Sequence, residues 1–498
     1  KLGLLYTRRR RSQPNVDSRR VSSSSKSNFC NRGITKKGGA ARMAGGAMAE
    51  NMCNQKLLPV FHITGGEGWI NDPNGLVEFH GEYHVFFQYY PHDCKWGPMH
   101  WGHVKSRDLT HWERLPIALY PDENEDGCFS GSAVVWEGKL WLLYTGFKQN
   151  EGGETVRQLQ CLASSDDGIH FVKHGVVIGE KELPADYCPW DFRDPKVFRR
   201  ERMFYCIVAA KKRGAGGRIL LFASEDLFRW KFVVDLFGRD GKGFMIECPD
   251  IRDDMGLLLY SEQFYPADGN KFLNVHSSLY CFGELSLPRG YRAEGEGEIV
   301  DYGFDFYAPQ TFPNTPVMIG WLNMWDRTNP FEKYGFAGQL TVPRRLIRRG
   351  NRLLQQPVYD GVPVRTEKDF STLSDHLLVG AVKVQAKGLS EFSVCLRKSD
   401  EYVTLFERRG DVWVFDRSKS GVPISGAEKD ADSLAGIRRM PYEDIEQTEI
   451  EIVSDLFSLE IFVNGISLSS VICPPTDADR LDLRISAGSC IYTRYQMK

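Results

Sequence analysis

Apolar and polar residues alternate in short runs along most of this chain, and clusters of turn residues separate the runs. The runs at residues 76–79 and 83–90 are rich in aromatic and β-branched side chains, and His80 and Gly81 stand between them. This pattern predicts two antiparallel strands joined by a turn. The 3.6-residue periodicity of amphipathic helices is almost absent. We therefore expect an all-β protein.

A motif of the form Ser-x-Asp-x-x-x-aromatic recurs three times at a fixed interval. Its copies begin at Ser106, Ser165 and Ser224, which are 59 residues apart in both cases. Each copy follows a short strand-like run. The motif therefore predicts the turn between two outer strands of a repeated sheet.

A second series of residues stands just before the first strand of each repeat, at intervals of 53 to 64 residues. Five units of this length, each with four strands, predict a five-bladed β-propeller over residues 57–345. The first strand of every blade in a propeller lines the central channel. We therefore expect the members of the series to converge at one end of that channel. They are Asp72, Ser130, Asp194, Glu247 and Tyr307.

The repeat ends after residue 345. From about residue 350 onward, alternating runs and polar turns continue without the propeller motifs, for example at residues 392–396 and 456–463. This pattern is typical of antiparallel sheets packed face to face. We expect residues 346–498 to form a C-terminal β-sandwich.

Residues 1–56 differ in composition from the rest of the chain. The first 50 residues carry twelve Lys and Arg against two acids and lack hydrophobic periodicity, so we expect a disordered basic leader. A leader of this kind resembles an organelle transit peptide. Sequence translated or added ahead of the true start is the interpretation that we favour.

The composition of the remaining chain excludes several classes of partner. Beyond residue 50, 63 acids outnumber 51 bases, which argues against nucleic acid. No apolar run approaches the roughly 18 residues of a membrane span. The twelve cysteines contain no C-x-x-C pair, so neither a zinc site nor a disulfide framework is expected. Scattered reduced thiols favour a cytoplasmic protein, or an organelle form if the leader is a transit peptide.

Three carboxylates belong to the expected channel. Asp72 lies in Asp-Pro-Asn-Gly, which predicts a tight turn that fixes the direction of its side chain. An aspartate that only caps its own turn is the alternative at this position. Asp194 and Glu247 occupy matching positions in other blades, and Arg193 is the one cation beside them. Because neighbouring negative charges raise one another's pKa, we expect a functional site.

Three sequence blocks carry a resemblance to a known family. They are W-I-N-D-P-N-G at residues 69–75, F-R-D-P at residues 192–195 and E-C-P-D at residues 247–250. In order and approximate spacing they resemble the signature blocks of glycoside hydrolase family 32, the invertases and fructan hydrolases. The resemblance runs from about residue 57 to the C-terminus. It implies a retaining β-fructofuranosidase with neither a metal nor an organic cofactor.

The resemblance also implies the catalytic roles. It makes Asp72 the nucleophile, Glu247 the acid/base, and Asp194 the acid that binds sugar hydroxyls and stabilises the oxocarbenium-like transition state. The sequence agrees, because Asn71 can donate a hydrogen bond to an ionised Asp72. The apolar residues before Glu247 favour the protonated form of that acid.

Further residues are expected to contact the substrate or support the acids. Arg193 would hold sugar hydroxyls and keep Asp194 ionised. A solvated strand-end amide is the alternative for Gln88, and a core aromatic is the alternative for Trp96. Cys248 precedes a proline, which favours simple burial over a role beside the acids. The expected substrate-binding set is Asn71, Gln88, Trp96, Phe129, Ser130, Arg193, Tyr307 and Trp321.

The expected partner is a small-molecule sugar, and the oligomeric state stays open. The resemblance is closer to bacterial-type intracellular enzymes, so hydrolysis of sucrose or sucrose 6-phosphate is the first hypothesis. A fructan exohydrolase or fructosyltransferase is the second. An inactive carbohydrate-binding propeller is the alternative from another class. A 6-phosphate needs cations, for which Lys95, Lys211 and Lys212 are candidates.

Overall fold

The computed structural model describes residues 57–238 and 245–498, and strands dominate them. The basic leader expected at residues 1–56 lies outside these residues. Helices in the described part are short, namely η1 (Asp253–Met255), η2 (Pro330–Tyr334) and α2 (Ala431–Leu434). No helix of this part has the length and apolar character that crossing a membrane demands.

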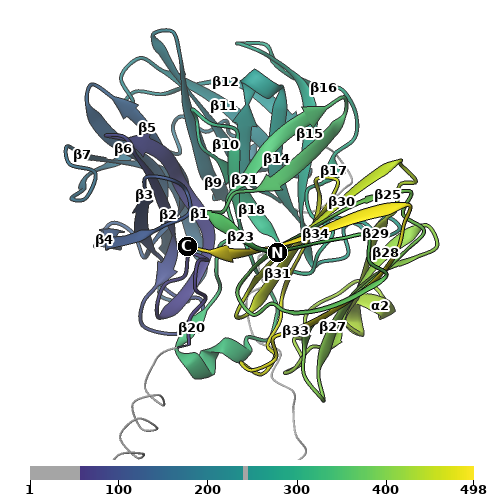
Figure 1. Cartoon of the computed structure of the whole chain (residues 1–498). Coiled ribbons are helices and arrows are strands. Elements are labelled where there is room, and N and C mark those ends of the chain that lie inside the picture. Colours follow the sequence, from purple (N-terminus) through teal and green to yellow (C-terminus); the bar gives the residue numbers. More distant parts are fainter. Residues whose placement is uncertain (1–56, 239–244) are drawn as a thin grey trace, which may run out of the picture. The chain divides into compact units, whose positions relative to one another are not determined.

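Five sheets form the first part of the described chain (Figure 1). The first contains β1 (Gly68–Phe79), β2 (Glu82–Tyr90), β3 (His100–Ser106) and β4 (Glu113–Leu119), with β20 (Phe336–Ala337) beside β1. The second contains β5 (Gly127–Trp136), β6 (Lys139–Gln149), β7 (Thr155–Ser165) and β8 (Val172–Ile178). The third contains β9 (Tyr187–Arg200), β10 (Met203–Lys212), β11 (Gly217–Ser224) and β12 (Lys231–Gly238). The fourth contains β13 (Ile246–Arg252), β14 (Leu257–Gln263), β15 (His276–Ser286), β16 (Gly290–Ala293) and β17 (Glu298–Ile299).

The five sheets close into a ring. Their innermost strands contact one another in the order β1, β5, β9, β13 and β18 (Tyr307–Thr311), and β18 returns to β1. β20 pairs in parallel with the start of β1, so a late segment of the chain completes the first sheet. Successive meanders around a closed ring are the arrangement of a propeller. The expected five-bladed β-propeller is confirmed.

The fifth sheet extends further along the chain than the sequence repeat. It contains β18, β19 (Val317–Trp321), β21 (Arg344–Arg349) and β22 (Arg352–Pro357). The expected boundary at residue 345 therefore falls inside β21. A long connection, residues 322–343, separates the second strand of this blade from the third, and no copy of the motif marks its last turn, so the sequence did not reveal the outer strands. We propose Pro357 as the end of the propeller.

The Ser-x-Asp motif forms the turn between the third and fourth strands of the first three blades. In the first copy, Asp108 Oδ1 accepts hydrogen bonds of 2.9 Å from the backbone N–H groups of Thr110 and His111. Leu109, between Asp108 and Thr110, adopts a positive φ of 68°. The carboxylate thus satisfies two donors that the reversing chain leaves open. The motif has the expected position, and its role is structural.

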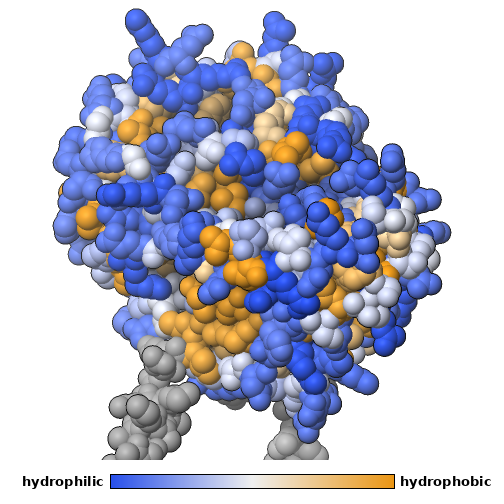
Figure 2. Space-filling model, viewed as in Figure 1, coloured by the Kyte–Doolittle hydropathy of each residue, from blue (hydrophilic) through white to orange (hydrophobic). Residues whose placement is uncertain are grey.

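Two six-stranded antiparallel sheets form the C-terminal part and enclose one apolar core, which confirms the β-sandwich. Outside the cores, hydrophilic residues cover most of the visible face (Figure 2). One sheet has the order β23 (Gly361–Lys368), β34 (Ser489–Met497), β25 (Gly380–Lys387), β30 (Gln447–Asp455), β31 (Ser458–Val463) and β32 (Ile466–Val471). The other has the order β24 (Thr372–His376), β33 (Arg480–Ser486), β26 (Glu391–Lys398), β27 (Val403–Arg409), β28 (Val412–Lys419) and β29 (Ile437–Pro441).

Buried charges join the propeller to the sandwich. Arg344 of β21 contacts Asp301 at 3.0 Å and Glu460 of β31 at 2.5 Å, and all three side chains are fully buried. His62, ahead of β1, lies 2.8 Å from both Asp455 and Glu460. Burial opposes its charge, but the two carboxylates raise the pKa of His62 to about 9. The two modules therefore share one ionic network.

Replacing Arg344 with methionine should destabilise the protein by about 3–5 kcal/mol, because Asp301 would remain buried without a cation and Glu460 would keep only His62. Urea unfolding at pH 7 measures this change. Arg345→Met, at an exposed position of the same strand, is the matched control, and we expect a change of less than about 0.5 kcal/mol. Equal losses in both variants would contradict the network argument.

Candidate active site

Each of the five innermost strands is interrupted by a β-bulge. A bulge opposes two residues to one on the partner strand, so it bends the strand and re-aims a side chain. In each of these strands, one bulge includes or directly adjoins a member of the series predicted from the repeat. The five positions are Asp72 in β1, Ser130 in β5, Asp194 in β9, Glu247 in β13 and Tyr307 in β18.

The tight turn expected at Asp-Pro-Asn-Gly is wrong. β1 runs unbroken from Gly68 to Phe79 and pairs with β2 on both sides of this segment. Two register shifts absorb the turn-forming residues as bulges. Gly75 has a φ of 56°, and a Cβ there would lie 2.8 Å from Phe86, so the second bulge requires glycine. The hairpin itself turns at His80 and Gly81, as expected.

Asp72 is buried, and its two carboxylate oxygens have different surroundings. Oδ2 accepts a hydrogen bond of 2.7 Å from the Ser130 hydroxyl and lies 3.5 Å from the Cys248 sulfur. Oδ1 has no hydrogen-bond partner among the described residues. Burial raises the pKa of Asp72, although the Ser130 hydrogen bond opposes this. Hydrogen bonding therefore fixes Oδ2 of Asp72, whereas Oδ1 has no hydrogen bond from the described residues.

Asp194 lies beside Asp72, with Cys248 between them. Its Oδ2 accepts a hydrogen bond of 2.9 Å from the Cys248 backbone N–H and lies 3.7 Å from the Cys248 sulfur. Burial raises the pKa of Asp194 to about 7, against the lowering effect of Arg193. Cys248 is buried as expected, but it also touches both aspartates, which the neighbouring proline did not indicate.

Glu247 accepts three hydrogen bonds. Oε1 accepts from Arg193 at 3.0 Å and from Gln263 at 2.9 Å, and Oε2 accepts from the Tyr307 hydroxyl at 2.6 Å. Burial alone would raise the pKa of Glu247, but the Arg193 charge and the hydrogen bonds lower it overall. The expectation of a protonated Glu247 is therefore wrong for the unliganded site. The apolar neighbours in sequence did not reveal donors from three other strands.

The expected aromatic contacts divide between the rim and the core. Trp96 is 43% exposed and meets Phe129 edge-on at 5.9 Å. Phe129 in turn stacks on Phe147 at 4.2 Å. Trp321 is fully buried and packs against Trp69 in a cluster that also contains Tyr307 and Cys248. Trp96 is thus accessible to a ligand, as its predicted role requires, whereas Trp321 has no accessible face.

Two polar residues of the expected set have structural partners. Gln88 is buried and donates to the Cys128 carbonyl at 3.0 Å, so it links β2 to β5 instead of ending in solvent. Asn71 is also buried, and its Oδ1 accepts from the Trp69 indole N–H at 2.9 Å. Gln88 therefore fixes the backbone of β5, and Asn71 fixes the side chain of Trp69.

Gln263 and His276 were missed by the sequence analysis. They face each other across β14 and β15, and Gln263 donates to Glu247. Gln263 could have been found by the argument used for Gln88, because it lies on the strand that pairs with the strand of an acid. His276 is buried, and its Nδ1 accepts from the Phe264 backbone N–H at 3.2 Å. It follows an irregular segment, and no repeat signal marks it.

The raised pKa of Asp194 predicts a pH dependence of stability. An acid whose pKa rises to about 7 on folding binds its proton more tightly in the folded state. Its contribution is fully present below the unfolded pKa near 4 and is lost as the pH rises through about 7. Relative to Asp194→Asn, the wild-type free energy of unfolding should fall by roughly 2–4 kcal/mol between pH 4 and 7. A constant difference across urea titrations at these pH values would contradict the assignment.

Comparisons with known proteins identify related sequences over nearly the whole described chain. The model of the glycosyl hydrolases family 32 N-terminal domain matches residues 62–357, and that of the family 32 C-terminal domain matches residues 359–497. Sucrose-6-phosphate hydrolase of Zymomonas mobilis subsp. mobilis is 34% identical over 489 residues, covering 90% of this chain and 93% of the relative. Raffinose invertase of Escherichia coli is 35% identical, covering 87% and 93%.

Solved structures of similar proteins have the same fold. A family 32 β-fructofuranosidase of Bombyx mori aligns with a TM-score of 0.77 and 30% identity, over 91% of this chain and 97% of that one. A variant of the Bombyx mori enzyme was solved in complex with sucrose. Sucrose-6-phosphate hydrolase of Lactobacillus gasseri aligns with a TM-score of 0.80 and 25% identity, over 91% and 95% of the two chains.

Proposed function

Because this chain belongs to glycosyl hydrolase family 32, we propose that its propeller channel is the active site of a retaining β-fructofuranosidase. The observation that carries the proposal is the meeting of three carboxylates from three blades. The Cys248 sulfur lies within 3.7 Å of both Asp72 and Asp194, and Arg193 links this pair to Glu247. Two carboxyl groups are what hydrolysis through a covalent glycosyl intermediate requires.

Asp72 is the nucleophile in this proposal. Its Oδ2 is held by Ser130, whereas Oδ1 is free of hydrogen bonds within the described structure and is available to attack the anomeric carbon. The hydrogen bond from Ser130 stabilises the ionised form that attack requires. Burial raises the energy of that ionised carboxylate, and formation of the fructosyl ester removes its charge.

Glu247 is the acid/base, and it must acquire its proton after the substrate enters. In the unliganded site, Arg193 and Tyr307 favour the carboxylate. A bound sugar displaces water from the channel and makes three neighbouring negative charges costlier, which favours proton uptake. The pKa of Tyr307 is raised by burial, so its neutral hydroxyl can rotate from donor to acceptor when Oε2 gains a proton.

Asp194 and Arg193 bind the fructosyl ring in this proposal. Asp194 has a pKa near neutrality and accepts from a backbone N–H, so it can share a proton with a sugar hydroxyl. Arg193 also contacts Asp191 at 3.0 Å, which fixes its orientation toward Glu247. Three coupled acids titrate together, so the pH profile of activity will report the cluster and not one residue.

The substrate that we propose is sucrose or sucrose 6-phosphate. The names of the relatives include both sucrose-6-phosphate hydrolases and an invertase, so they support a fructosyl sugar without deciding the phosphate. Lys211 is close enough to Asp191 and Arg193 for their charges to interact, which makes it the better phosphate candidate. Lys212 pairs with Asp186 at 3.3 Å, and its interactions point away from Arg193.

Hydrolysis assays on four substrates test the proposal. The purified protein should release fructose from sucrose or sucrose 6-phosphate at least tenfold faster, in kcat/KM, than from inulin or levan. Lys211→Met should lower kcat/KM for sucrose 6-phosphate and leave that for sucrose nearly unchanged. Faster cleavage of inulin or levan would favour a fructan exohydrolase. No cleavage of any of them by folded protein would favour the inactive carbohydrate-binding propeller.

A further inference from the structure

The segment that joins β14 to β15 begins and ends beside Glu247. The last residue of β14 is Gln263 and the first of β15 is His276, and the two are paired across the strands. Gln263 donates a hydrogen bond of 2.9 Å to Glu247. Burial raises the pKa of Glu247, whereas the charges of Arg193 and His276 lower it. Both residues that flank the segment therefore act on Glu247, and we call residues 264–275 the acid/base loop.

The backbone is strained near both ends of the acid/base loop. Phe264 and Phe272 adopt positive φ values of 56° and 60°. Bulky residues are rare in this left-handed region, because their side chains crowd the backbone, so other contacts must hold both positions. The buried rings of Tyr265 and Phe272 meet edge-on at 4.7 Å. The loop thus returns on itself, and residues 265 and 272 form its neck.

A lysine of the sandwich closes this neck. Lys429 lies between β28 and α2, and its Nζ donates to the Tyr265 carbonyl at 2.5 Å and to the Phe272 carbonyl at 2.8 Å. Burial and the charge of Arg438 lower the pKa of Lys429 to about 8, against the effect of Glu428. At pH 7 the side chain is therefore still an ammonium group, which has enough protons to donate to both carbonyls at once.

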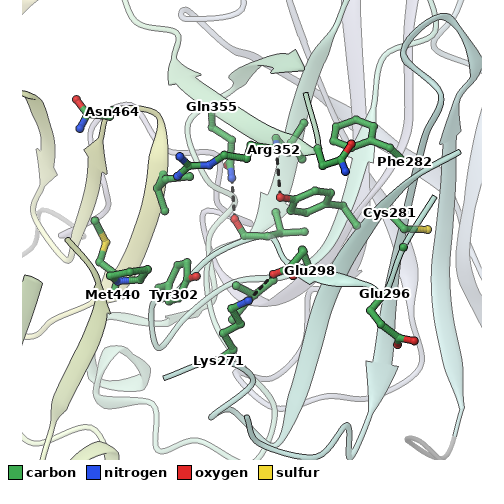
Figure 3. A pocket seen from close by; sticks show the side chains of 18 of the residues that line it. Lys271, Cys281, Phe282, Glu296, Glu298, Tyr302, Arg352, Gln355, Met440 and Asn464 are labelled. Atoms are coloured by element: carbon green, nitrogen blue, oxygen red, sulfur yellow. Dashed lines mark hydrogen bonds and ion pairs between the residues drawn. The ribbon is translucent and has the colours of Figure 1, made fainter. Parts of the chain in front are cut away.

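Two further contacts hold the acid/base loop, but neither bridges its neck. Lys271 pairs with Glu298 at 2.5 Å (Figure 3), and both side chains are partly exposed, so the pair contributes little to stability. Arg438 donates to the side-chain oxygen of Asn274 at 2.5 Å, beyond the neck. Of these contacts, only those of Lys429 connect the two sides of the neck by hydrogen bonds.

We propose that Lys429 is a positioning residue for catalysis, which closes the neck of the acid/base loop and thereby holds Gln263 and His276 beside Glu247. The Phe264 backbone N–H, at the start of the loop, donates to His276 Nδ1 at 3.2 Å, so opening the neck would also release the imidazole. The inference rests on the proposed function, since it needs Glu247 to be the acid/base. It goes beyond that function by making the propeller site depend on a side chain of the sandwich.

Lys429→Met tests the inference, because methionine has an unbranched side chain of similar length but cannot donate to the two carbonyls. On the best sugar substrate, kcat/KM should fall about tenfold, since Glu247 loses its fixed surroundings. On a fructosyl fluoride, whose leaving group needs no proton, the loss should be less than about threefold. A purely structural role would lower both values equally. Lys429→Arg keeps a charged donor and should restore at least about half of the wild-type kcat/KM on the sugar.

The matched control is Lys419→Met, at an exposed lysine that ends β28, and we expect wild-type kinetics from it. Hydrogen–deuterium exchange in residues 264–275 should be faster in Lys429→Met and unchanged in the control. If Lys429→Met does not fold, Lys429→Gln, whose amide is too short to reach both carbonyls, takes its place.

Equal losses on both substrates, no recovery in Lys429→Arg, or unchanged exchange in residues 264–275 would overturn the inference while the proposed function stands. The exchange measurement does not depend on catalysis. A wild-type protein that cleaves no fructoside, but whose loop exchange still depends on Lys429, would instead contradict the proposed function.

Discussion

Asp72→Asn should lower kcat on the best substrate by about 10⁴-fold or more, while the protein still binds that substrate. The amide keeps the size of the side chain and can still contact Ser130, but it cannot form the fructosyl ester. Because the lost interaction is made mainly in the transition state, the dissociation constant should change less than tenfold. Rapid-quench assays and isothermal titration measure the two quantities.

The matched control for this change is Asp411→Asn, at an exposed position in the turn between β27 and β28. We expect wild-type kinetics from it. Thermal unfolding of both variants should stay close to that of the wild type. If Asp72→Asn retained more than about a hundredth of wild-type kcat, the role of Asp72 as nucleophile would be refuted.

Glu247→Gln should lower kcat on sucrose by about 10²–10⁴-fold, because the leaving group would depart without a proton. A substrate whose leaving group needs no protonation, such as an aryl or fluoride fructoside, should lose much less in the first step. This asymmetry separates the acid/base from the nucleophile, whose loss affects both kinds of substrate. Equal losses on both substrates would contradict the role of Glu247.

Stereochemistry provides a further control on the pair of roles. A covalent intermediate formed and broken with two inversions releases β-fructose from a β-fructoside. Proton NMR of the first product, recorded before mutarotation, distinguishes the anomers. Release of the α-anomer would mean that water attacks the anomeric carbon directly and that Asp72 is not the nucleophile.

The sequence predicted the channel because the repeat places one residue of each blade at the same strand position. Asp72, Asp194 and Glu247 could be placed together without any measured distance. The same periodicity could not show how the site is built, since a bulge depends on pairing across strands. The turn expected at Asp-Pro-Asn-Gly failed for this reason: local turn preference was overridden by strand pairing on both sides.

Protonation was the least predictable property of the site. Apolar neighbours in sequence suggested a protonated Glu247, but its pKa is set by Arg193, Gln263 and Tyr307, which come from other strands. The junction between the modules was equally hidden. Nothing near His62 in the sequence points to Asp455, because the two residues are 393 positions apart.

The pairing of β1 with β20 sets the order in which a newly made chain can complete its active site. The second and third blades are continuous meanders and can form as soon as each has left the ribosome. The first blade cannot be completed until β20 has emerged, and His62 lacks its carboxylates until β30 and β31 follow. The strand that carries Asp72 is thus among the earliest to be synthesised, but it gains its pairing with β20 late. Catalytic competence should therefore appear only after the sandwich has been translated.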